Sequence, residues 1–471
     1  MASDNNNQRA RSSGSGSNQL FPLPLNSMER FHLYDQTAKF PNTICSRLVF
    51  DGVINPEWAE QALRTALARH PFMGSVVEYK NGKPFFDFQP EECLPKNWHE
   101  PWRETAGFAS PNSRGLQVVS QCSDSKTAFW FQSSHVLCDG VGAIPFLTDW
   151  LKSYHNLHAG RDATYKLRKV DNQILKSRNN LGLLKRRYLR HLWKQPLGLY
   201  GTAKFLFRNV AAVTDSENDS REIVDWDYQN QPAVLGNWLD RKSSELLVEV
   251  AESKNVSLNA LLLARFYVHL ASWLRQHRPV QAEKWLRIIH PFNLRDYSHR
   301  RMPATNRVAI VQIDRCQKDL SDFDGLVGGL DREISVIRDW ELGKLFLIAI
   351  RGMSWFPGML QRSAGSEKCR GTCVFTGLGE PFSRSSLPIE SPPENDLPEQ
   401  VKPAARMQVG DLHLDTVDLW GPVRHGTPIN LIVLRHLGRL RLCLHYDPRI
   451  LDRDTMSEFL SAYCQRLREL N

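Results

Sequence analysis

The sequence contains no uncharged apolar run that approaches the roughly 18 residues a membrane-spanning helix needs. Its first 19 residues, MASDNNNQRARSSGSGSNQ, also lack the apolar core of a secretory signal peptide. Apolar residues make up 41% of the 471 residues and charged residues 24%, which is ordinary for a globular protein. These features argue against an integral membrane protein and exclude a collagen, a coiled-coil rod and a wholly disordered chain. They predict a globular, cytoplasmic protein.

Cysteine is sparse, odd in number and scattered, which argues against a disulfide framework. The nine cysteines are therefore expected to be reduced thiols; they are Cys45, Cys93, Cys122, Cys138, Cys316, Cys369, Cys373, Cys443 and Cys464. A structural zinc site usually needs two close cysteine pairs, or one pair with nearby histidines. The single close pair, Cys369 and Cys373, does not meet this condition, and we expect no bound metal.

Acidic residues are almost absent from one stretch, residues 166–208. It holds six lysines and six arginines against one acid, Asp171, and so carries +11 in a chain whose net charge is +9. The remaining residues therefore sum to −2, and the chain is a near-neutral body with one basic segment. A nucleic-acid-binding surface would not concentrate its charge so narrowly, so no nucleic-acid partner is expected.

Strand and helix patterns alternate along the chain and predict a mixed α/β protein. At ~150 residues per domain, the length suggests about three domains or two large ones. Ser46–Gly52 has the pattern of a strand, and Asn55 and Pro56 mark the start of a helix. Further strands are expected at 127–132, 285–292, 307–314 and 373–379, and a hairpin at 429–447 that turns near Gly438. Helices are expected at 141–160, 243–254, 257–275, 323–350 and 451–470, the last capped by Asp452. Residues 383–403 are expected to form an exposed loop.

One short motif carries chemistry: His135-Val136-Leu137-Cys138-Asp139-Gly140. The predicted strand 127–132 runs directly into it and a predicted helix follows, so His135 stands at a strand exit. A histidine held there has a pKa near neutrality and can take and return a proton. On the motif alone, a second interpretation stays open, in which His135 is a buried structural histidine and Asp139 forms the turn.

The strand–HxxxDG–helix arrangement resembles the superfamily of chloramphenicol acetyltransferase. That superfamily includes nonribosomal peptide condensation domains, plant BAHD acyltransferases and bacterial wax ester synthase/diacylglycerol acyltransferases. The resemblance extends from about Pro24 to Leu470. Besides the motif, it rests on the closing hairpin and helix and on the segments PLNSMERFHLYDQ, LARHPFMGSVV, NVSLNALLLARFYVHLASWL, FNLRDYSHRRMPATNRVA and CVFTGLGEP.

The resemblance implies an α/β fold, a two-layer sandwich in each of two similar halves that pack as a pseudo-dimer with a tunnel between them. The expected divisions are a disordered tail at 1–25, an N-terminal half at 26–165, a basic amphipathic linker at 166–220 and a C-terminal half at 221–471.

The resemblance also implies roles for particular residues. His135 is the expected general base of an acyltransferase that moves an acyl group from a thioester directly to a hydroxyl or amine acceptor. In the family the aspartate of HxxxDG is mainly structural and pairs with an arginine of the second half, a position that matches Arg295. The candidates for binding the oxyanion or positioning substrate are Thr376 and the backbone of Gly140; Thr376 as an ordinary strand residue remains equally open.

Two departures from the family patterns bear on the branch. Condensation domains usually carry two adjacent histidines, and here Ser134 stands in the first place, which argues mildly against peptide-bond formation. Plant enzymes carry DFGWG near the end, where this chain has Asp418-Leu419-Trp420-Gly421. We therefore favour O-acyl transfer, in a wax ester synthase-like or alcohol acyltransferase-like branch.

Other functions stay open at this point. Cys138, three residues from His135, could form an acyl-enzyme, although a small buried residue is the alternative. A zinc site built from His135, Cys138 and Asp139 matches no usual ligand spacing. The chain could also be a free-standing peptide-type condensation domain, or a non-catalytic docking module that keeps the fold and has lost the chemistry.

The sequence does not identify the acyl donor or the acceptor. We expect no bound cofactor; acyl-CoA or an acyl carrier protein would be the donor and co-substrate, and the acceptor a small molecule or a lipid. On a helical wheel for Leu181–Lys194, most leucines fall on one face and Arg186, Arg187 and Arg190 on the other. Three interpretations of 166–208 follow: an interfacial helix on an anionic membrane surface, a linker packed on the body, or a site for an acidic carrier protein or CoA phosphates.

Overall fold

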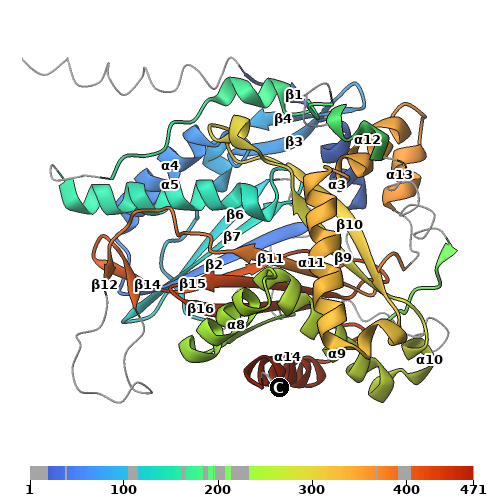
Figure 1. Cartoon of the computed structure of the whole chain (residues 1–471). Coiled ribbons are helices and arrows are strands. Elements are labelled where there is room, and N and C mark those ends of the chain that lie inside the picture. Colours follow the sequence, from blue (N-terminus) through green and yellow to red (C-terminus); the bar gives the residue numbers. More distant parts are fainter. Residues whose placement is uncertain are drawn as a thin grey trace, which may run out of the picture.

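The computed structural model describes residues 20–37, 40–103, 115–160, 165–183, 189–194, 196, 207–213, 233–365, 369–390 and 405–469. Two large mixed sheets with helices packed on them form the body of the protein (Figure 1). This is the mixed α/β, two-lobed architecture expected from the sequence.

The first large sheet has seven strands, in the order β12–β13–β14–β2–β7–β6–β5. Their bounds are β12 Ile389–Glu390, β13 Arg406–Val409, β14 Leu412–Trp420, β2 Thr43–Asp51, β7 Lys126–Ser134, β6 Leu116–Cys122 and β5 Glu100–Pro101. A small three-stranded sheet accompanies it, formed by β1 (Leu23–Pro24), β4 (Lys83–Phe88) and β3 (Ser75–Lys80). The helices of this half are α3 (Ser27–Asp35), α4 (Pro56–Arg69) and α5 (Gly140–Ala159).

The second large sheet has six strands, in the order β10–β9–β11–β15–β16–β8. Their bounds are β10 Val308–Arg315, β9 Leu286–Asn293, β11 Cys373–Gly379, β15 Ile429–His436, β16 Arg439–Tyr446 and β8 Val234–Trp238. The helices of this half are α8 (Arg241–Ser253), α9 (Leu258–His277), α10 (Pro279–Ala282), α11 (Phe323–Asp339), α12 (Lys344–Met353), α13 (Met359–Ala364) and α14 (Arg453–Arg468).

Each half has its own hydrophobic core. In the first, Trp150 of α5 packs edge-on against Phe129 of β7, with ring centroids 4.8 Å apart, and both are buried. In the second, Phe266 of α9 meets Tyr463 of α14 at 5.4 Å, again in a buried cluster. Burial of large aromatic side chains is a major source of folding free energy, so each half stabilises its own sheet and helices.

Local sequence signals place the element ends. Asn55 Oδ1 accepts hydrogen bonds from the backbone N–H groups of Glu57 and Trp58, which caps α4 as expected. The hairpin of β15 and β16 turns through Gly438, whose φ of 82° suits glycine. The helix expected at 323–350 is two helices, α11 and α12. It breaks where Glu341 adopts a φ of 54°.

The chain crosses from the second half back to the first. Strand β14 pairs antiparallel with β2, from Trp420 opposite Cys45 to His413 opposite Asp51. Strand β12 lies inside the stretch 383–403 that the sequence predicted to be a loop, so that prediction is wrong in part; residues 391–404 lie outside the described residues. The divisions expected at residues 165 and 220 stay predictions.

The Asp418-Leu419-Trp420-Gly421 segment is structural. The Asp418 carboxylate is completely buried and accepts hydrogen bonds from Arg47 at 2.8 Å and Arg441 at 2.6 Å. Those two cations lower the pKa of Asp418 against the effect of burial. Trp420 stacks on Trp130 of β7 with centroids 5.8 Å apart. The segment therefore joins the two sheets at their contact.

Two arginines of the basic segment pair with acidic residues in the body of the protein. The Arg178 guanidinium forms a fork with the Glu29 carboxylate, at 2.6 and 2.8 Å, and both side chains are buried. Arg208 pairs with Asp314 and stacks over Trp285, 3.6 Å from the ring centroid. Arg178 and Arg208 are therefore used inside the fold, whereas Lys166, Lys169, Lys176 and Arg190 are exposed.

A continuous amphipathic helix beginning at Leu181 is not present. Residues 181–183 are not helical, residues 184–188 lie outside the described residues, residues 189–190 are helical, and 192–194 form a single 3₁₀ turn. Arg307 donates to the carbonyl oxygens of Arg178 and Asn180, and Gly182 adopts a φ of 62°. These contacts hold the chain in a turn where the sequence predicted helix. In the described part of the chain, no helix has the length and apolar character to cross a membrane.

Candidate active site

His135 stands at the exit of β7, where the sequence placed it. Its backbone N–H donates to the Asn42 carbonyl at 2.8 Å. From the second half, Asn306 Nδ2 donates to the carbonyl oxygens of His135 and Val136, at 2.6 and 3.0 Å. Contacts from both halves therefore fix the backbone that carries the imidazole.

The His135 imidazole is in an environment that keeps it neutral. Burial lowers its pKa, and its own carbonyl, Asp139 and Asn306 offset part of that effect. Nδ1 is enclosed and meets no hydrogen-bond partner of good geometry in the described structure. The residue as a whole is only partly covered and lines a large cavity. A neutral imidazole open to a cavity can accept a proton from a bound molecule.

Asp139 and Arg295 are brought together as expected, across the two halves. Arg295 Nη2 donates to Asp139 Oδ2 at 3.0 Å and to the Thr305 carbonyl at 2.5 Å. The other contacts of the carboxylate are to backbone: Gly142 N–H at 2.7 Å, which caps α5, and Arg307 N–H at 2.6 Å. Asp139 is thus a buried junction between the histidine turn, α5 and the second half.

Glycine at position 142 is required here, and the sequence interpretation missed it. A Cβ at Gly142 would lie 2.5 Å from the Thr305 oxygen and 2.8 Å from the Arg295 guanidinium. A Cβ at Gly140 would make only an ordinary contact, 3.5 Å from Leu419. Gly140 lines the cavity, whereas Gly142 permits the close approach that seals the junction. The missed signal is the spacing Asp-Gly-x-Gly, with the second glycine in the first turn of the helix.

A second histidine, His32 of α3, lies against His135. The two rings stack with centroids 4.0 Å apart and 11° between their planes. Burial, then the charges of His135 and Arg424, lower the pKa of His32 well below its usual value. Its Nε2 is enclosed and has no hydrogen-bond partner among the described residues. His32 belongs to the matched segment PLNSMERFHLYDQ, but local sequence cannot reveal a contact across about a hundred residues.

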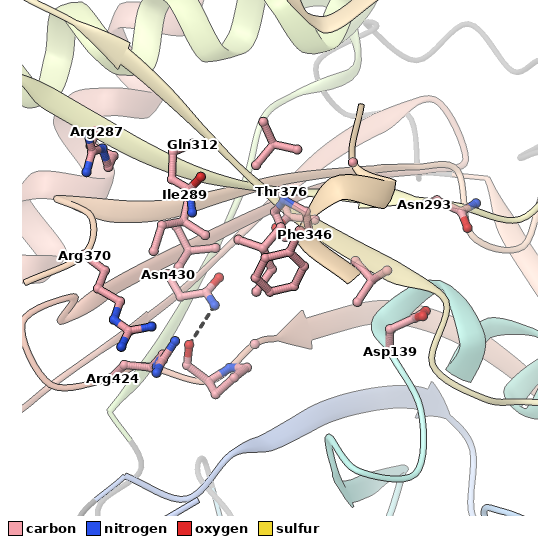
Figure 2. Close-up of a pocket in the computed structure, with 18 of the residues that line it drawn as sticks. Asp139, Arg287, Ile289, Asn293, Gln312, Phe346, Arg370, Thr376, Arg424 and Asn430 are labelled. Carbon is pink, nitrogen blue, oxygen red and sulfur yellow. Dashed lines mark hydrogen bonds between the residues drawn. The ribbon is translucent and has the colours of Figure 1, made fainter. Parts of the chain in front are cut away.

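The cavity has a volume of about 930 Å³, at the upper end of the ~300–1,000 Å³ usual for ligand sites. Strands of both large sheets and helices α3, α5, α11 and α12 line it. Its wall is largely apolar, with Ile289 and Phe346 prominent beside Thr376 (Figure 2). Thr376 lies on β11, opposite Ile432 of β15, and faces the cavity. All five site residues expected from the sequence, namely His135, Asp139, Gly140, Arg295 and Thr376, therefore lie in or directly behind one site.

Polar groups gather at the end of the cavity away from Asp139, where Arg370, Arg424 and Asn430 point into it (Figure 2). Arg424 pairs with Asp35 of α3 and donates to the Ala364 carbonyl. Burial raises the pKa of Asp35 to about 6, although Arg424 and Arg370 act in the other direction. This polar end was not anticipated from the sequence.

Cys138 has the character of a packing residue. It is completely buried, and burial raises the pKa of its thiol to about 12. The reactive thiolate is therefore scarce at neutral pH. No three His, Cys, Asp or Glu side chains gather as metal ligands in the described ranges.

We expect Cys138→Ser to retain turnover within a few-fold of wild type, because the thiol is protonated and enclosed. Incubation with an acyl thioester followed by mass spectrometry of the intact chain should show no acyl adduct at this position. Cys316→Ser, at a partly exposed cysteine, is the matched control. An acyl group trapped on Cys138 would contradict direct transfer.

No protein-family model matches the chain, and no curated protein matches it in sequence. Solved structures do match over nearly the whole length. The first condensation domain of the calcium-dependent antibiotic synthetase, bound to a substrate analogue, matches with a TM-score of 0.61 at 13% identity, covering 95% of each chain. The starter condensation domain of rhizomide synthetase, in complex with C8-CoA and Leu-SNAC, gives 0.61 at 13%, covering 96% of this chain and 95% of that one.

The epimerization domain from the third module of tyrocidine synthetase B gives a TM-score of 0.62 at 12% identity, covering 94% of this chain and 96% of that one. At such identities the likeness establishes the fold: the chain has the two-lobed fold of condensation domains. These neighbours include condensation domains and an epimerization domain, so fold alone leaves the chemistry open.

Proposed function

We propose that the chain is an acyltransferase that moves an acyl group from a thioester to a hydroxyl or amine acceptor. The observation that carries this proposal is the position of His135, a neutral imidazole at the wall of a large, mostly apolar cavity lined by both halves. The fold shared with condensation domains supports it.

His135 acts as the general base. This role uses the tautomer that carries its proton on the enclosed Nδ1 and leaves the Nε2 lone pair free to accept a proton. The acceptor X–H gives its proton to Nε2 as X attacks the thioester carbonyl carbon. When the tetrahedral intermediate collapses, the C–S bond breaks and the proton passes from Nε2 to the leaving thiolate. No acyl-enzyme forms, and Thr376 or the Gly140 backbone would stabilise the oxyanion.

The remaining site residues position the base. Asp139 and Arg295 hold the turn that carries His135, and the stacked His32 fixes the plane of its ring. Holding both substrates in one dry cavity can contribute ~7–11 kcal/mol of barrier reduction. The donor is acyl-CoA or an acyl-carrier protein; a condensation-domain neighbour was solved with C8-CoA. We favour O-acyl transfer, as the sequence suggested.

Thiol release tests the proposal. The full chain is incubated with short-, medium- and long-chain acyl-CoAs and with panels of alcohols and amines, and free thiol is measured. Acceptor-dependent release that is lost in His135→Ala would support an acyltransferase. Binding of acyl-CoA without release under any pairing would favour the non-catalytic docking module instead, and release that needs an aminoacyl acceptor would favour the peptide-type condensation domain.

Membrane contact through the basic segment is a separate prediction. Since Arg178 and Arg208 are paired within the fold, we expect little preference for phosphatidylserine vesicles over phosphatidylcholine vesicles in co-sedimentation. The variant in which Arg186, Arg187 and Arg190 are changed to glutamine should behave like wild type; residues 184–188 lie outside the described residues. A strong preference for anionic vesicles that this variant loses would contradict the expectation and would point to a lipid acceptor.

A further inference from the structure

We propose that the polar end of the cavity, formed by Arg370 and Arg424 with Asn430 beside them, binds an acidic group of a substrate, a carboxylate or a phosphate. The inference rests on the proposed acyltransferase function and specifies the class of one of its substrates. That substrate carries its acidic group at the two arginines while its reacting end reaches His135.

In the described part of the chain, positive charges outnumber negative ones at this end of the cavity. Two guanidinium groups face each other there (Figure 2), and Asp35 is the carboxylate that pairs with one of them, Arg424. His32, the remaining titratable group of the cluster, is neutral because its pKa is lowered well below the usual value. At least one positive charge is therefore uncompensated among the described residues, inside a cavity whose walls are mostly apolar.

The Arg370 Nη2 donates to the Ser363 carbonyl, and no acid among the described residues forms an ion pair with Arg370. Burial and then the Arg424 cation lower the pKa of Arg370, and the Asp35 carboxylate offsets them only in part, which reflects the cost of keeping this charge there. A bound anion would lower that cost, and the planar guanidinium forks match carboxylate or phosphate oxygens.

Two other arginines on the same cavity wall, Arg287 and Arg315, do have acidic partners. Arg287 is bridged to Asp314 by two hydrogen bonds, at 2.7 and 2.9 Å, and Arg315 pairs with Glu333 at 2.9 Å. Because Arg287 and Arg315 already have acidic partners, the expected site of the anion is at Arg370 and Arg424.

Asn430 adds an unused acceptor. The residue is 4% exposed, its Nδ2 donates to the Pro422 carbonyl at 2.9 Å, and its Oδ1 is enclosed with no partner among the described residues. An enclosed acceptor without a partner is unfavourable. A ligand that presents an N–H or O–H next to its acidic group would satisfy Asn430 and the arginines together.

The site is close to the reacting histidine through a short chain of contacts. The His135 ring stacks on His32, and Asn42 Nδ2 lies 3.3 Å from both His32 Nδ1 and Asp35 Oδ2. Asp35 in turn pairs with Arg424. A small substrate can therefore span from the arginines to Nε2 of His135 within the one cavity.

The test measures anion binding by the full chain, independently of turnover, as the thermal stabilisation produced at increasing probe concentration at pH 7.5. The probes are succinate, inorganic phosphate, CoA and 3′-dephospho-CoA. Arg370→Gln should weaken binding of the preferred probe about 10- to 100-fold, since a hydrogen-bonded charge pair is lost. Arg370→Lys should retain part of the affinity. Arg362→Gln, at an exposed arginine of α13, should leave it unchanged.

Asp35→Asn should strengthen binding, because it removes the one acid that competes for Arg424. Tighter binding of succinate than of phosphate would identify a substrate carboxylate as the source of the acidic group. If wild type binds CoA more tightly than 3′-dephospho-CoA and Arg370→Gln does not, the source is a phosphate of the donor. Binding of none of the probes, or equal binding by Arg370→Gln and wild type, would overturn the inference. His135→Ala separates this inference from the proposed function: Arg370-dependent anion binding should persist in that variant, and would persist even if no thiol release were found.

Discussion

Replacing His135 with alanine is expected to lower turnover by roughly two to four orders of magnitude, the usual contribution of a positioned general base. The fold should survive, because the neighbouring contacts at Asn42 and Asn306 use the backbone of His135 and not its side chain. Thiol release and thermal unfolding, measured on the same preparation, check both parts of the expectation.

The pH profile of wild type gives a second readout. Only neutral His135 can accept the proton, and burial lowers its pKa below the usual 6.5. The activity should therefore stay level as the pH falls to 6.5 and decline only below it. His413→Gln, at a partly exposed histidine paired with Glu390, is the matched control and should not change the profile. Turnover that persists in His135→Ala, or an acidic limb above pH 6.5, would contradict the role of His135.

Local signals in the sequence were sufficient for the part of the site that one segment builds. The strand exit, the histidine and the following helix lie within about thirty consecutive residues, and hydrophobic periodicity reports such neighbours. The cap that Asp139 places on that helix was not predicted. The resemblance then supplied Arg295, which is far away in the chain. Thr376 was found in the same way, and the structure places it on the cavity wall.

The contacts that sequence reasoning missed join residues far apart in the chain. His32 meets His135, which depends on how α3 lies against the turn after β7, and Asp35 meets Arg424, which depends on how α3 lies against the second half. Charge is visible in a sequence but its partner is not. Arg178 was counted only as one cation of the basic segment 166–208, whereas it is buried against Glu29. The transfer of β14 to the first sheet likewise follows from strand pairing with β2, which no local pattern reports.

The ion pair of Asp139 and Arg295 should contribute strongly to stability. The Asp139 side chain is 5% exposed and Arg295 16%, so removing either partner leaves the other charge poorly solvated. Breaking a buried pair in this way costs about 3–5 kcal/mol of the free energy of unfolding. We expect Arg295→Gln to lie toward the upper value, because the stranded carboxylate is the more buried partner. Asp139→Asn should lie toward the lower one, because it can keep the cap on Gly142.

Denaturant unfolding of the two single variants and the double variant forms the cycle that isolates this pair. The double variant should lose less free energy of unfolding than the two single losses added together, since no unpaired charge remains. Arg241→Gln, at an exposed pair with Glu245, is the control and should cost no more than about 1 kcal/mol. Because the same carboxylate fixes the turn that carries His135, both single variants should also lose turnover. Additive losses in the cycle, or single variants as stable as the control, would mean that Asp139 and Arg295 do not hold the two halves together at the histidine.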